Sequence, residues 1–331
     1  MKIALLGAGR IGKMHAAILS EVVGGDQLFV ADVDAQAAAA VAAANGATAV
    51  SVDEAIERAD AVAIAAASNV HGDLIRKAIG LGKPTFCEKP LAPGLDESRE
   101  LVSMVEASGV PFMLGFQRRF DPAYVEARRL IETGEIGTVY AIRLAGHDPA
   151  PPHEAYIPAS GGLFRDFSIH DWDVIRWLTG SEVAEVYAVG AVRGFEVFRK
   201  YDDVDTAIAA ITMANGVLAV LTTARHDPLG YDIRTEIFGS QDSVVVGLGP
   251  RTPIRSLEAD WVASDAPKWN FFIDRFTSAY EAEIAAFVRV ARGEVPTPCT
   301  ARDGLQALIV AEAATRSLKE HRPVTTAEFD A

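Results

Sequence analysis

Short apolar runs alternate with amphipathic stretches over the first part of the chain. The apolar runs predict buried strands at residues 2–7, 28–33, 61–67, 84–88 and 111–116. The helical spacing of apolar residues between them predicts helices that begin near residues 11, 35, 72 and 95. Strands that alternate with helices in this way form a parallel sheet with helices on both faces. We therefore predict a doubly wound parallel sheet in an N-terminal domain of residues 1–118.

From residue 119 on, the order of the pattern changes. After a predicted helix at 121–133, strand-like runs follow at residues 138–146, 185–192, 205–213, 217–225, 233–239 and 243–248. Two further helices are predicted at 275–292 and 300–318. Turns as short as Ala214-Asn215-Gly216 favour antiparallel pairing of neighbouring strands. The fold class is thus α/β, and residues 119–331 form a second α/β domain with an open, mainly antiparallel sheet.

Composition narrows the choice of partners. The chain of 331 residues has 31 Lys and Arg against 45 Asp and Glu, a net charge of -14. Such a charge argues against nucleic-acid or anionic-membrane binding and favours a small-molecule partner. Cys87 and Cys299 suggest neither a disulfide framework nor a metal site, which fits a reducing cytoplasm. The first apolar run is broken by glycines, unlike a signal peptide, and no apolar run is long enough to span a bilayer.

The sequence Gly7-Ala8-Gly9-Arg10-Ile11-Gly12 lies between the first predicted strand and the first predicted helix. Glycines let the backbone approach a pyrophosphate, and a helix N-terminus offers it N–H groups. Alone, this motif could be a plain tight turn, but Asp32 ends the second predicted strand, where a ribose-binding acid belongs. The Asp32 carboxylate would repel the 2′-phosphate of NADP, and Val33 rather than an arginine follows it. We therefore expect NAD as the cofactor.

A second motif, Glu88-Lys89-Pro90, follows the predicted strand at 84–88. Ligands of doubly wound sheets gather at the carboxyl ends of the strands, so Lys89 would project toward the nicotinamide. The tripeptide alone is common on protein surfaces, and its position is what suggests a function. An ammonium group there can stabilise the alkoxide character of a substrate oxygen as hydride leaves.

Along the chain, these motifs are followed by "GFQRRFDP" at 115–122 and then by "DFSIHDWD" at 166–173. The ordered set resembles the glucose-fructose oxidoreductase and inositol dehydrogenase (Gfo/Idh/MocA) family over essentially the whole chain. Within that family, residues 147–178 are most similar to the bacterial inositol 2-dehydrogenases. The resemblance implies an NAD-binding Rossmann domain, a substrate-binding α/β domain often used for oligomerisation, and a homotetramer or homodimer.

The resemblance also implies roles for single residues. Lys89 matches the lysine of the family's EKP motif, and Asp166 and His170 match its DxxxH motif; these three form the family's proposed catalytic group. Asp173 matches an acid that contacts polyol hydroxyls, and Tyr231 resembles a late substrate-binding tyrosine. Cofactor contacts are expected from Gly7, Gly9, Arg10, Ile11, Gly12, Asp32, Val33, Ala66, Ser68, His71, Glu88, Lys89 and Gln117.

Three positions on the substrate side depart from the family pattern. His147 replaces an expected arginine, Gln117 stands where asparagine is common, and Pro158 stands where a lysine is usual. These departures leave the particular polyol open. Arg118 and Arg119 could reach the substrate or the cofactor; we assign Arg118 to the substrate. The alternative for such a pair at the start of a domain is a structural ion pair.

In one continuous helix at about 100° per residue, Asp166, His170 and Asp173 fall within an arc of roughly 60°. Apolar residues border this stripe on both sides, and buried aspartates need partners such as Lys89 and substrate hydroxyls. The alternative is that Asp166 caps the helix and His170 is an ordinary core histidine. We favour the functional interpretation because the cofactor motif and Lys89 point to the same crevice. Asp171 lies off the stripe and is not assigned to the site.

Together these features predict oxidation of a secondary alcohol, with hydride transfer to nicotinamide. His170 is the expected general base because an imidazole ordinarily titrates near pH ~6.5. Lys89 would hydrogen-bond the same substrate oxygen, and Asp166 would orient both groups. The leading substrate is an inositol, with oxidation of myo-inositol to 2-keto-inositol. The alternatives are an aldose or other sugar derivative and, in another class, a dinucleotide-sensing regulator without turnover. No metal site is expected.

Overall fold

The structure, a computed structural model, describes residues 1–329, so the last two residues of the predicted second domain lie outside the described range. Contacts group the chain into two compact units. The first unit contains Met1–Phe120 and Ser278–Leu305, and the second contains Asp121–Thr277 and Gln306–Ala331. We describe each unit by itself.

The return of Ser278–Leu305 to the first unit differs from the predicted division into 1–118 and 119–331. Apolar packing explains the return, because the ring of Phe287 lies 5.6 Å from that of Phe86. The backbone N–H of Leu114 also donates to the carbonyl oxygen of Cys299 at 3.0 Å. Such contacts join segments that are distant in sequence, and local periodicity does not encode them.

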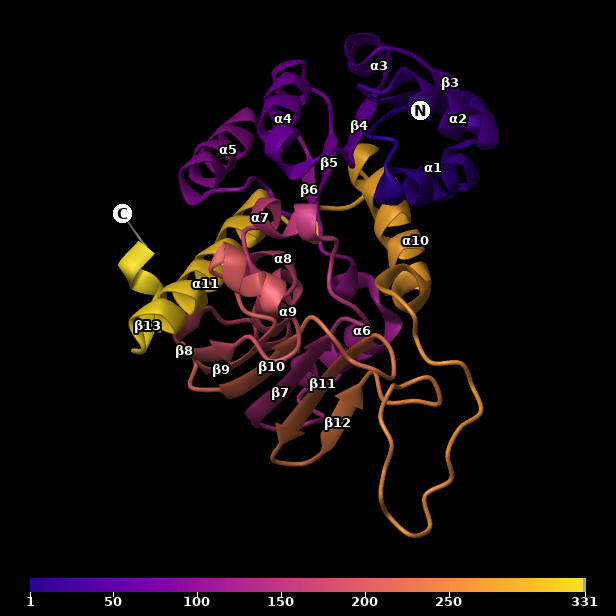
Figure 1. The fold of residues 1–331 in the computed structure, drawn as a ribbon. Helices are drawn as coiled ribbons and strands as arrows, with labels where there is room; N and C mark the ends of the chain where they lie inside the picture. Colours follow the sequence, from indigo (N-terminus) through magenta and orange to yellow (C-terminus); the bar gives the residue numbers. More distant parts are fainter. Residues whose placement is uncertain (330–331) are drawn as a thin grey trace. The chain divides into compact units, whose positions relative to one another are not determined.

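The first unit contains a parallel sheet of six strands in the order β3-β2-β1-β4-β5-β6 (Figure 1). Its strands are β1 Ile3–Leu6, β2 Leu28–Ala31, β3 Thr48–Ala49, β4 Ala61–Ile64, β5 Thr85–Glu88 and β6 Phe112–Gly115. Except for β3, they are buried along almost their whole length, which is why continuous apolar runs indicate them. The strand order reverses between β1 and β4, at the switch point where such sheets bind ligands. The predicted doubly wound sheet is confirmed.

The helices of the first unit are α1 Arg10–Val23, α2 Ala35–Ala44, α3 Val52–Arg58, α4 His71–Gly80, α5 Leu95–Ser108 and the larger part of α10 Phe272–Ala291. Two of them, α2 and α3, start at a side chain that caps them. Asp34 caps α2, because its Oδ1 accepts the backbone N–H groups of Gln36 and Ala37 at 2.9 and 3.2 Å. The helix α3 and the strand β3 are not predicted from the sequence, because both are too short to show a period.

The second unit contains a sheet of seven strands in the order β12-β11-β7-β10-β9-β8-β13. Its strands are β7 Val139–His147, β8 Val183–Ala191, β9 Thr206–Met213, β10 Leu218–Ala224, β11 Asp232–Gly239, β12 Ser243–Val246 and β13 Val324–Thr325. Within the described residues every pairing is antiparallel except that of β7 with β10. The predicted, mainly antiparallel sheet is confirmed. Because β7 and β10 run parallel, they end at the same edge, where His147 pairs with Ala224.

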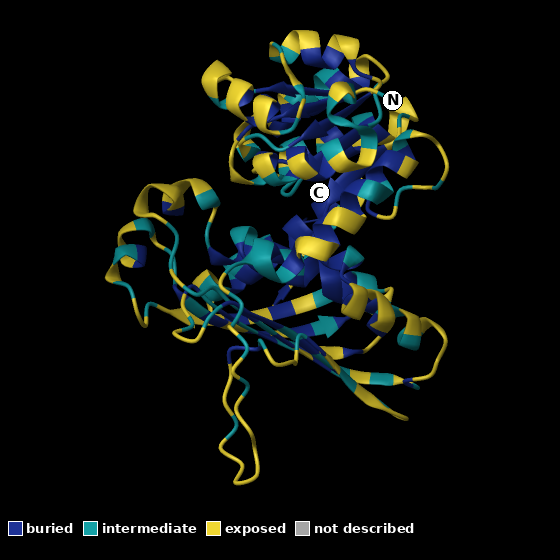
Figure 2. Cartoon of the chain, turned by 90° about the vertical axis from the view of Figure 1, so that its right-hand side faces the viewer, coloured by how far each residue is buried: buried dark blue, intermediate teal, exposed yellow. Residues whose placement is uncertain are grey.

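One face of the second sheet carries helices and the other is open. The helices of this unit are α6 Pro122–Glu132, α7 Ile157–Ser160, α8 Leu163–Asp166, α9 Ile169–Thr179 and the C-terminal part of α11 Ala301–Glu320. The Tyr124 hydroxyl on α6 lies 2.9 Å from Thr235 Oγ1 on β11. Buried and exposed positions alternate along the strands (Figure 2), so Ile208 on β9 is 48% exposed between buried neighbours. In residues 1–329, no helix is long and apolar enough to cross a membrane.

Candidate functional site

The loop between β1 and α1 has the space that a dinucleotide pyrophosphate requires. A Cβ atom on Gly9 would meet nothing within 4 Å. By contrast, a Cβ on Gly7 would lie 2.5 Å from the carbonyl oxygen of Ala65, and one on Gly12 would lie 2.0 Å from the carbonyl oxygen of Gly7. Gly7 and Gly12 therefore let the loop pack closely, whereas Gly9 leaves room for a ligand. The first turn of α1 contains no acid, so its N–H groups suit an anion.

Asp32 follows β2 and is bound to the same loop. Its Oδ2 accepts the backbone N–H of Ala8 at 2.6 Å, and its Oδ1 accepts that of Asp34 at 2.9 Å. A carboxylate offers about four acceptor positions, so about two remain for the hydroxyls of a ribose. Val33 and Arg10 are exposed beside this loop. The residues present thus fit NAD, although the individual contacts stay predictions.

His71 joins the loop after β4 to the EKP segment. Its Nδ1 lies 2.8 Å from the carbonyl oxygen of Pro90, and its Nε2 lies 3.1 Å from that of Ala66. Burial lowers the pKa of the His71 imidazole, although the bonds to the two carbonyls oppose this effect. His71 thereby fixes the backbone beside Lys89 against the loop that contains Ala66 and Ser68. The predicted contact of His71 with the cofactor is not tested by this geometry.

Glu88 ends β5 and has a partner within the first unit. Its Oε1 lies 2.7 Å from Nε2 of His15, which is completely buried on α1. The His15 ring contacts Phe86 and Tyr280 edge to face, with centroid distances of 5.5 and 5.9 Å. The His15–Glu88 contact holds the end of β5 and so places the half-buried Lys89 that follows.

The turn after β6 buries three polar residues that we expect near the ligands. Gln117 and Arg118 are 2% and 1% exposed. Arg119 binds Asp303 Oδ1 at 3.0 Å and donates to the carbonyl oxygen of Pro298 at 3.0 Å. Arg119 therefore forms a structural ion pair, whereas the ligand contacts of Gln117 and Arg118 stay predictions.

Residues 161–173 do not form one helix, and the prediction of a continuous polar stripe is wrong. The helix α8 ends at Asp166, and α9 begins only at Ile169. The carbonyl oxygen of Leu163 accepts the N–H groups of both Phe167 and Ser168, at 3.1 and 3.2 Å, which closes α8. The Ser168 hydroxyl binds Thr223 Oγ1 on β10 at 3.2 Å. The capping alternative for Asp166 is wrong too, because Asp166 is the last residue of α8 and not an N-cap.

Asp166 lies in a network of charged and hydroxyl groups. The Tyr156 hydroxyl donates to Asp166 Oδ1 at 2.8 Å, and Arg225 Nη2 binds Asp166 Oδ2 at 2.9 Å. Arg225 Nη1 lies 3.5 Å from Asp148 Oδ2. Burial by itself lowers the pKa of the Arg225 guanidinium, but the carboxylates of Asp166 and Asp148 hold it above its ordinary value. Asp166 is thus an anchored acid beside a permanent positive charge.

The other polar residues of the opening turns of α9 differ in burial. His170 is half-buried, whereas Asp171 and Asp173 are each 1% exposed. A Cβ atom on Gly146 would lie 3.3 Å from Asp171 Oδ2, so this carboxylate lies against β7. The exclusion of Asp171 from the site stays a prediction. The substrate contact of Asp173 stays a prediction.

Tyr231 precedes β11 and is 4% exposed, with its ring edge to face against Phe276 at 6.5 Å. Its predicted contact with a substrate is likewise untested. Sequence reasoning missed Tyr156, Asp148 and Arg225. For Asp148 and Arg225, the one indication of a role is that each directly follows a strand. The parallel pairing that brings the ends of those two strands together cannot be seen in the sequence.

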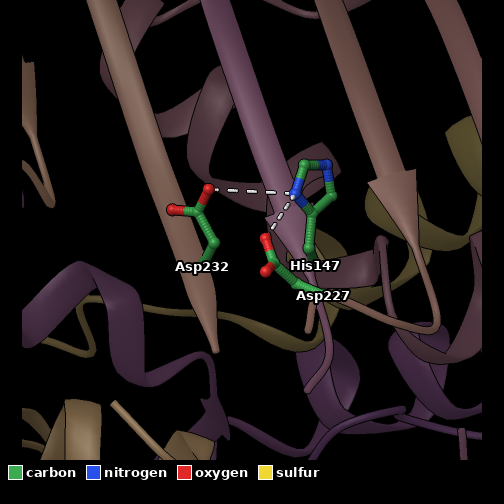
Figure 3. Close-up of side chains that lie close together, drawn as sticks. All are labelled: His147, Asp227 and Asp232. Carbon is green, nitrogen blue, oxygen red and sulfur yellow. Dashed lines mark ion pairs between the residues drawn. The ribbon is translucent and has the colours of Figure 1, made fainter. Parts of the chain in front are cut away.

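His147, one of the departures from the family pattern, lies beside two acids on β11 and the preceding turn (Figure 3). Its Nδ1 is 3.7 Å from Asp227 Oδ2 and 3.8 Å from Asp232 Oδ2, and the three groups lie close enough to hold a metal ion. However, Arg234 already binds Asp232, with Nε 2.9 Å from Oδ1 and Nη2 3.0 Å from Oδ2. We interpret this group as a charge network of the sheet, and the absence of a metal stays a prediction.

Comparisons with known proteins agree with this arrangement. The family model described as "Oxidoreductase family, NAD-binding Rossmann fold" matches residues 1–116, and the "GFO/IDH/MocA C-terminal domain" model matches residues 124–245. An uncharacterized oxidoreductase of Bacillus subtilis, YrbE, is 38% identical over 97% of this chain and 95% of its own. An inositol 2-dehydrogenase of Rhizobium meliloti is 36% identical over 99% of each chain.

Among solved structures, scyllo-inositol dehydrogenase from Lactobacillus casei, with NAD(H) and scyllo-inositol bound, is 30% identical with a TM-score of 0.87. The match covers 99% of each chain. The doubly wound sheet, the glycine loop with Asp32 and these full-length similarities lead to one conclusion. The chain belongs to the GFO/IDH/MocA family of oxidoreductases with an NAD-binding Rossmann fold.

Proposed function

We propose that this protein oxidises one secondary alcohol of a cyclic polyol with NAD, and that its substrate is an inositol. The observation that carries the proposal is the NAD-compatible loop of Gly7, Gly9 and Asp32 in a chain with full-length similarity to inositol 2-dehydrogenases. The resemblance at Lys89 and His170 supports it further.

In this proposal the residues of the chain bind the substrate hydroxyl group and remove its proton. When bound, NAD supplies the nicotinamide carbon that accepts the hydride. His170 takes the hydroxyl proton, since a neutral imidazole is a suitable base near neutral pH. Lys89 donates a hydrogen bond to the same oxygen and stabilises its developing negative charge. Asp166 supplies a fixed carboxylate and takes the orienting role that the resemblance implies, and Asp173, Arg118 and Tyr231 bind the remaining hydroxyls.

The test of the substrate is a set of initial rates of NADH formation. The substrates are myo-inositol, scyllo-inositol, chiro-inositol and common aldoses. We expect the highest kcat/KM for one of the inositols. Turnover of an aldose with none of the inositols would replace the substrate by a sugar, whereas no turnover of any of them would favour a regulator that binds the dinucleotide.

The test of the catalytic roles uses His170→Ala and Lys89→Ala. Removal of a general base lowers kcat by about 10² to 10⁴ without a change in NAD affinity. NAD affinity, measured by calorimetry, is the control that separates catalysis from folding. Nearly unchanged turnover in His170→Ala would refute the assignment of the base. A homotetramer or homodimer and a cytoplasmic location remain predictions from the sequence.

A further inference from the structure

Both oxygens of the Asp166 carboxylate have a donor within the second unit. Oδ1 accepts the Tyr156 hydroxyl at 2.8 Å, and Oδ2 pairs with Arg225 Nη2 at 2.9 Å. The Asp166 side chain is 13% exposed and that of Arg225 is 3% exposed. Two bonds at opposite oxygens fix the plane of the carboxylate.

Arg225 is itself fixed from several sides. Its backbone N–H donates to the carbonyl oxygen of Asp205 at 2.8 Å. Its second amino group faces Asp148 Oδ2 at 3.5 Å, and its guanidinium carbon lies 5.7 Å from the centre of the Phe167 ring. A guanidinium stays charged at all working pH values and has a rigid, planar set of donors. Arg225 therefore favours the ionised form of Asp166 and sets its direction.

Tyr156 reaches Asp166 from the proline-rich segment that follows β7. Tyr156 is 47% exposed, although its hydroxyl makes the bond to Asp166. The same segment is held separately, because Glu154 Oε1 accepts Lys200 Nζ at 2.8 Å and the Tyr201 hydroxyl at 3.1 Å. The Tyr156 bond is thus distinct from the contacts that hold the segment on the second unit.

We propose that Arg225 and Tyr156 are positioning residues, which hold the ionised Asp166 carboxylate in the orientation that the alcohol oxidation needs. This inference rests on the proposed function, because it gives Asp166 a part in that reaction. It also separates the role of Asp166 from that of His170 in the proposed reaction. A carboxylate already bound to a buried guanidinium is a poor proton acceptor, so the hydroxyl proton goes to His170.

The test is a double-mutant cycle on kcat with Tyr156→Phe and Asp166→Asn, for any polyol that the wild-type protein oxidises. Tyr156→Phe removes one hydrogen bond to a charged group, and we expect it to lower kcat on the order of 10-fold. In the Asp166→Asn background the same change should alter kcat less than about 2-fold, because Tyr156 acts through Asp166. The KM for NAD should stay unchanged in Tyr156→Phe.

Two further variants separate positioning from folding. Tyr201→Phe is the matched control, since it removes a hydroxyl that holds the segment through Glu154 without touching Asp166, and its kcat should equal that of the wild type. Arg225→Lys keeps the positive charge but loses the planar set of guanidinium donors. Its kcat should therefore fall by a factor on the order of 10² at an unchanged unfolding temperature. In Arg225→Ala, added ethylguanidinium should restore part of kcat, whereas ethylammonium should not.

The outcomes are distinguishable. Equal effects of Tyr156→Phe with and without Asp166 would overturn the inference and leave the proposed function standing. A loss in Tyr201→Phe as large as that in Tyr156→Phe would do the same, because holding the segment would then explain both. An inactive wild-type protein would overturn the proposed function and this inference with it, since Asp166 would have no reaction to serve.

Discussion

Replacing Asp32 by asparagine tests the cofactor assignment at its most specific point. Asp32 accepts the N–H groups of Ala8 and Asp34. An asparagine oxygen retains one of these bonds, so the loop keeps part of its support while the negative charge is removed. A hydrogen bond from a ribose hydroxyl to a charged acceptor contributes about 1.5–3 kcal/mol. Since about 1.4 kcal/mol corresponds to tenfold, the KM for NAD should rise about 10- to 100-fold.

The same change should favour NADP. Two unit charges about 4 Å apart repel by roughly 4 kcal/mol at an effective dielectric constant near 20, and Asp32→Asn removes that repulsion of a 2′-phosphate. The ratio of kcat/KM for NAD to kcat/KM for NADP should therefore fall by about 10² to 10³. Initial rates of NADH and NADPH formation at saturating polyol measure this ratio.

Asp34→Asn is the matched control for the charge, because asparagine also caps helices and so preserves the start of α2. Its cofactor ratio should stay within about 3-fold of the wild type. The assignment of Asp32 to the ribose is wrong if Asp32→Asn keeps the wild-type ratio at an unchanged unfolding temperature, or if Asp34→Asn lowers the ratio as much as Asp32→Asn does.

Three other predictions use the space around single residues or their exposure to solvent. Gly12→Ala should destabilise the fold by about 1–3 kcal/mol, because its Cβ would lie 2.0 Å from a backbone oxygen. Gly9→Ala should unfold like the wild type and lose NAD affinity. Thermal unfolding measures the first effect and calorimetry with NAD measures the second. Burial raises the pKa of the Cys87 thiol well above its usual range and Cys299 is also buried, so neither should react with iodoacetamide until the protein is denatured; labelling of native protein, counted by mass spectrometry, would contradict this. Ile208→Lys places a charge on the exposed face of the second sheet; where that face joins the protomers of the predicted oligomer, the molar mass measured by light scattering should fall, and an unchanged mass would exclude that face as the oligomer contact.

The sequence predicts best where one local rule decides the structure. The strand β4 is an unbroken apolar run because both of its faces are buried. The helix α2 begins at the predicted residue because Asp34 caps its start, and it ends where Asn45-Gly46 follows. The first sheet and the fit of its glycine loop to NAD follow from such rules.

The sequence predicts less where distant segments meet. No spacing along the chain reveals that Ser278–Leu305 belongs to the first unit. Ser168, which lies in the break between α8 and α9, binds Thr223, 55 residues further along the chain. For the same reason the partners of Asp166 could not be foreseen, since Tyr156 and Arg225 come from a loop and from the end of another strand.

The discontinuous first unit also bears on the synthesis of the protein. A ribosome releases residues 1–120 first, but Ser278–Leu305 emerges only after the whole segment Asp121–Thr277. Until then Phe86 and the backbone of Leu114 lack the partners that the late segment provides. Chains usually fold domain by domain from the N-terminus. Here the unit that begins first is completed late, so Phe86 and Leu114 wait for these partners until Asp121–Thr277 has been synthesised.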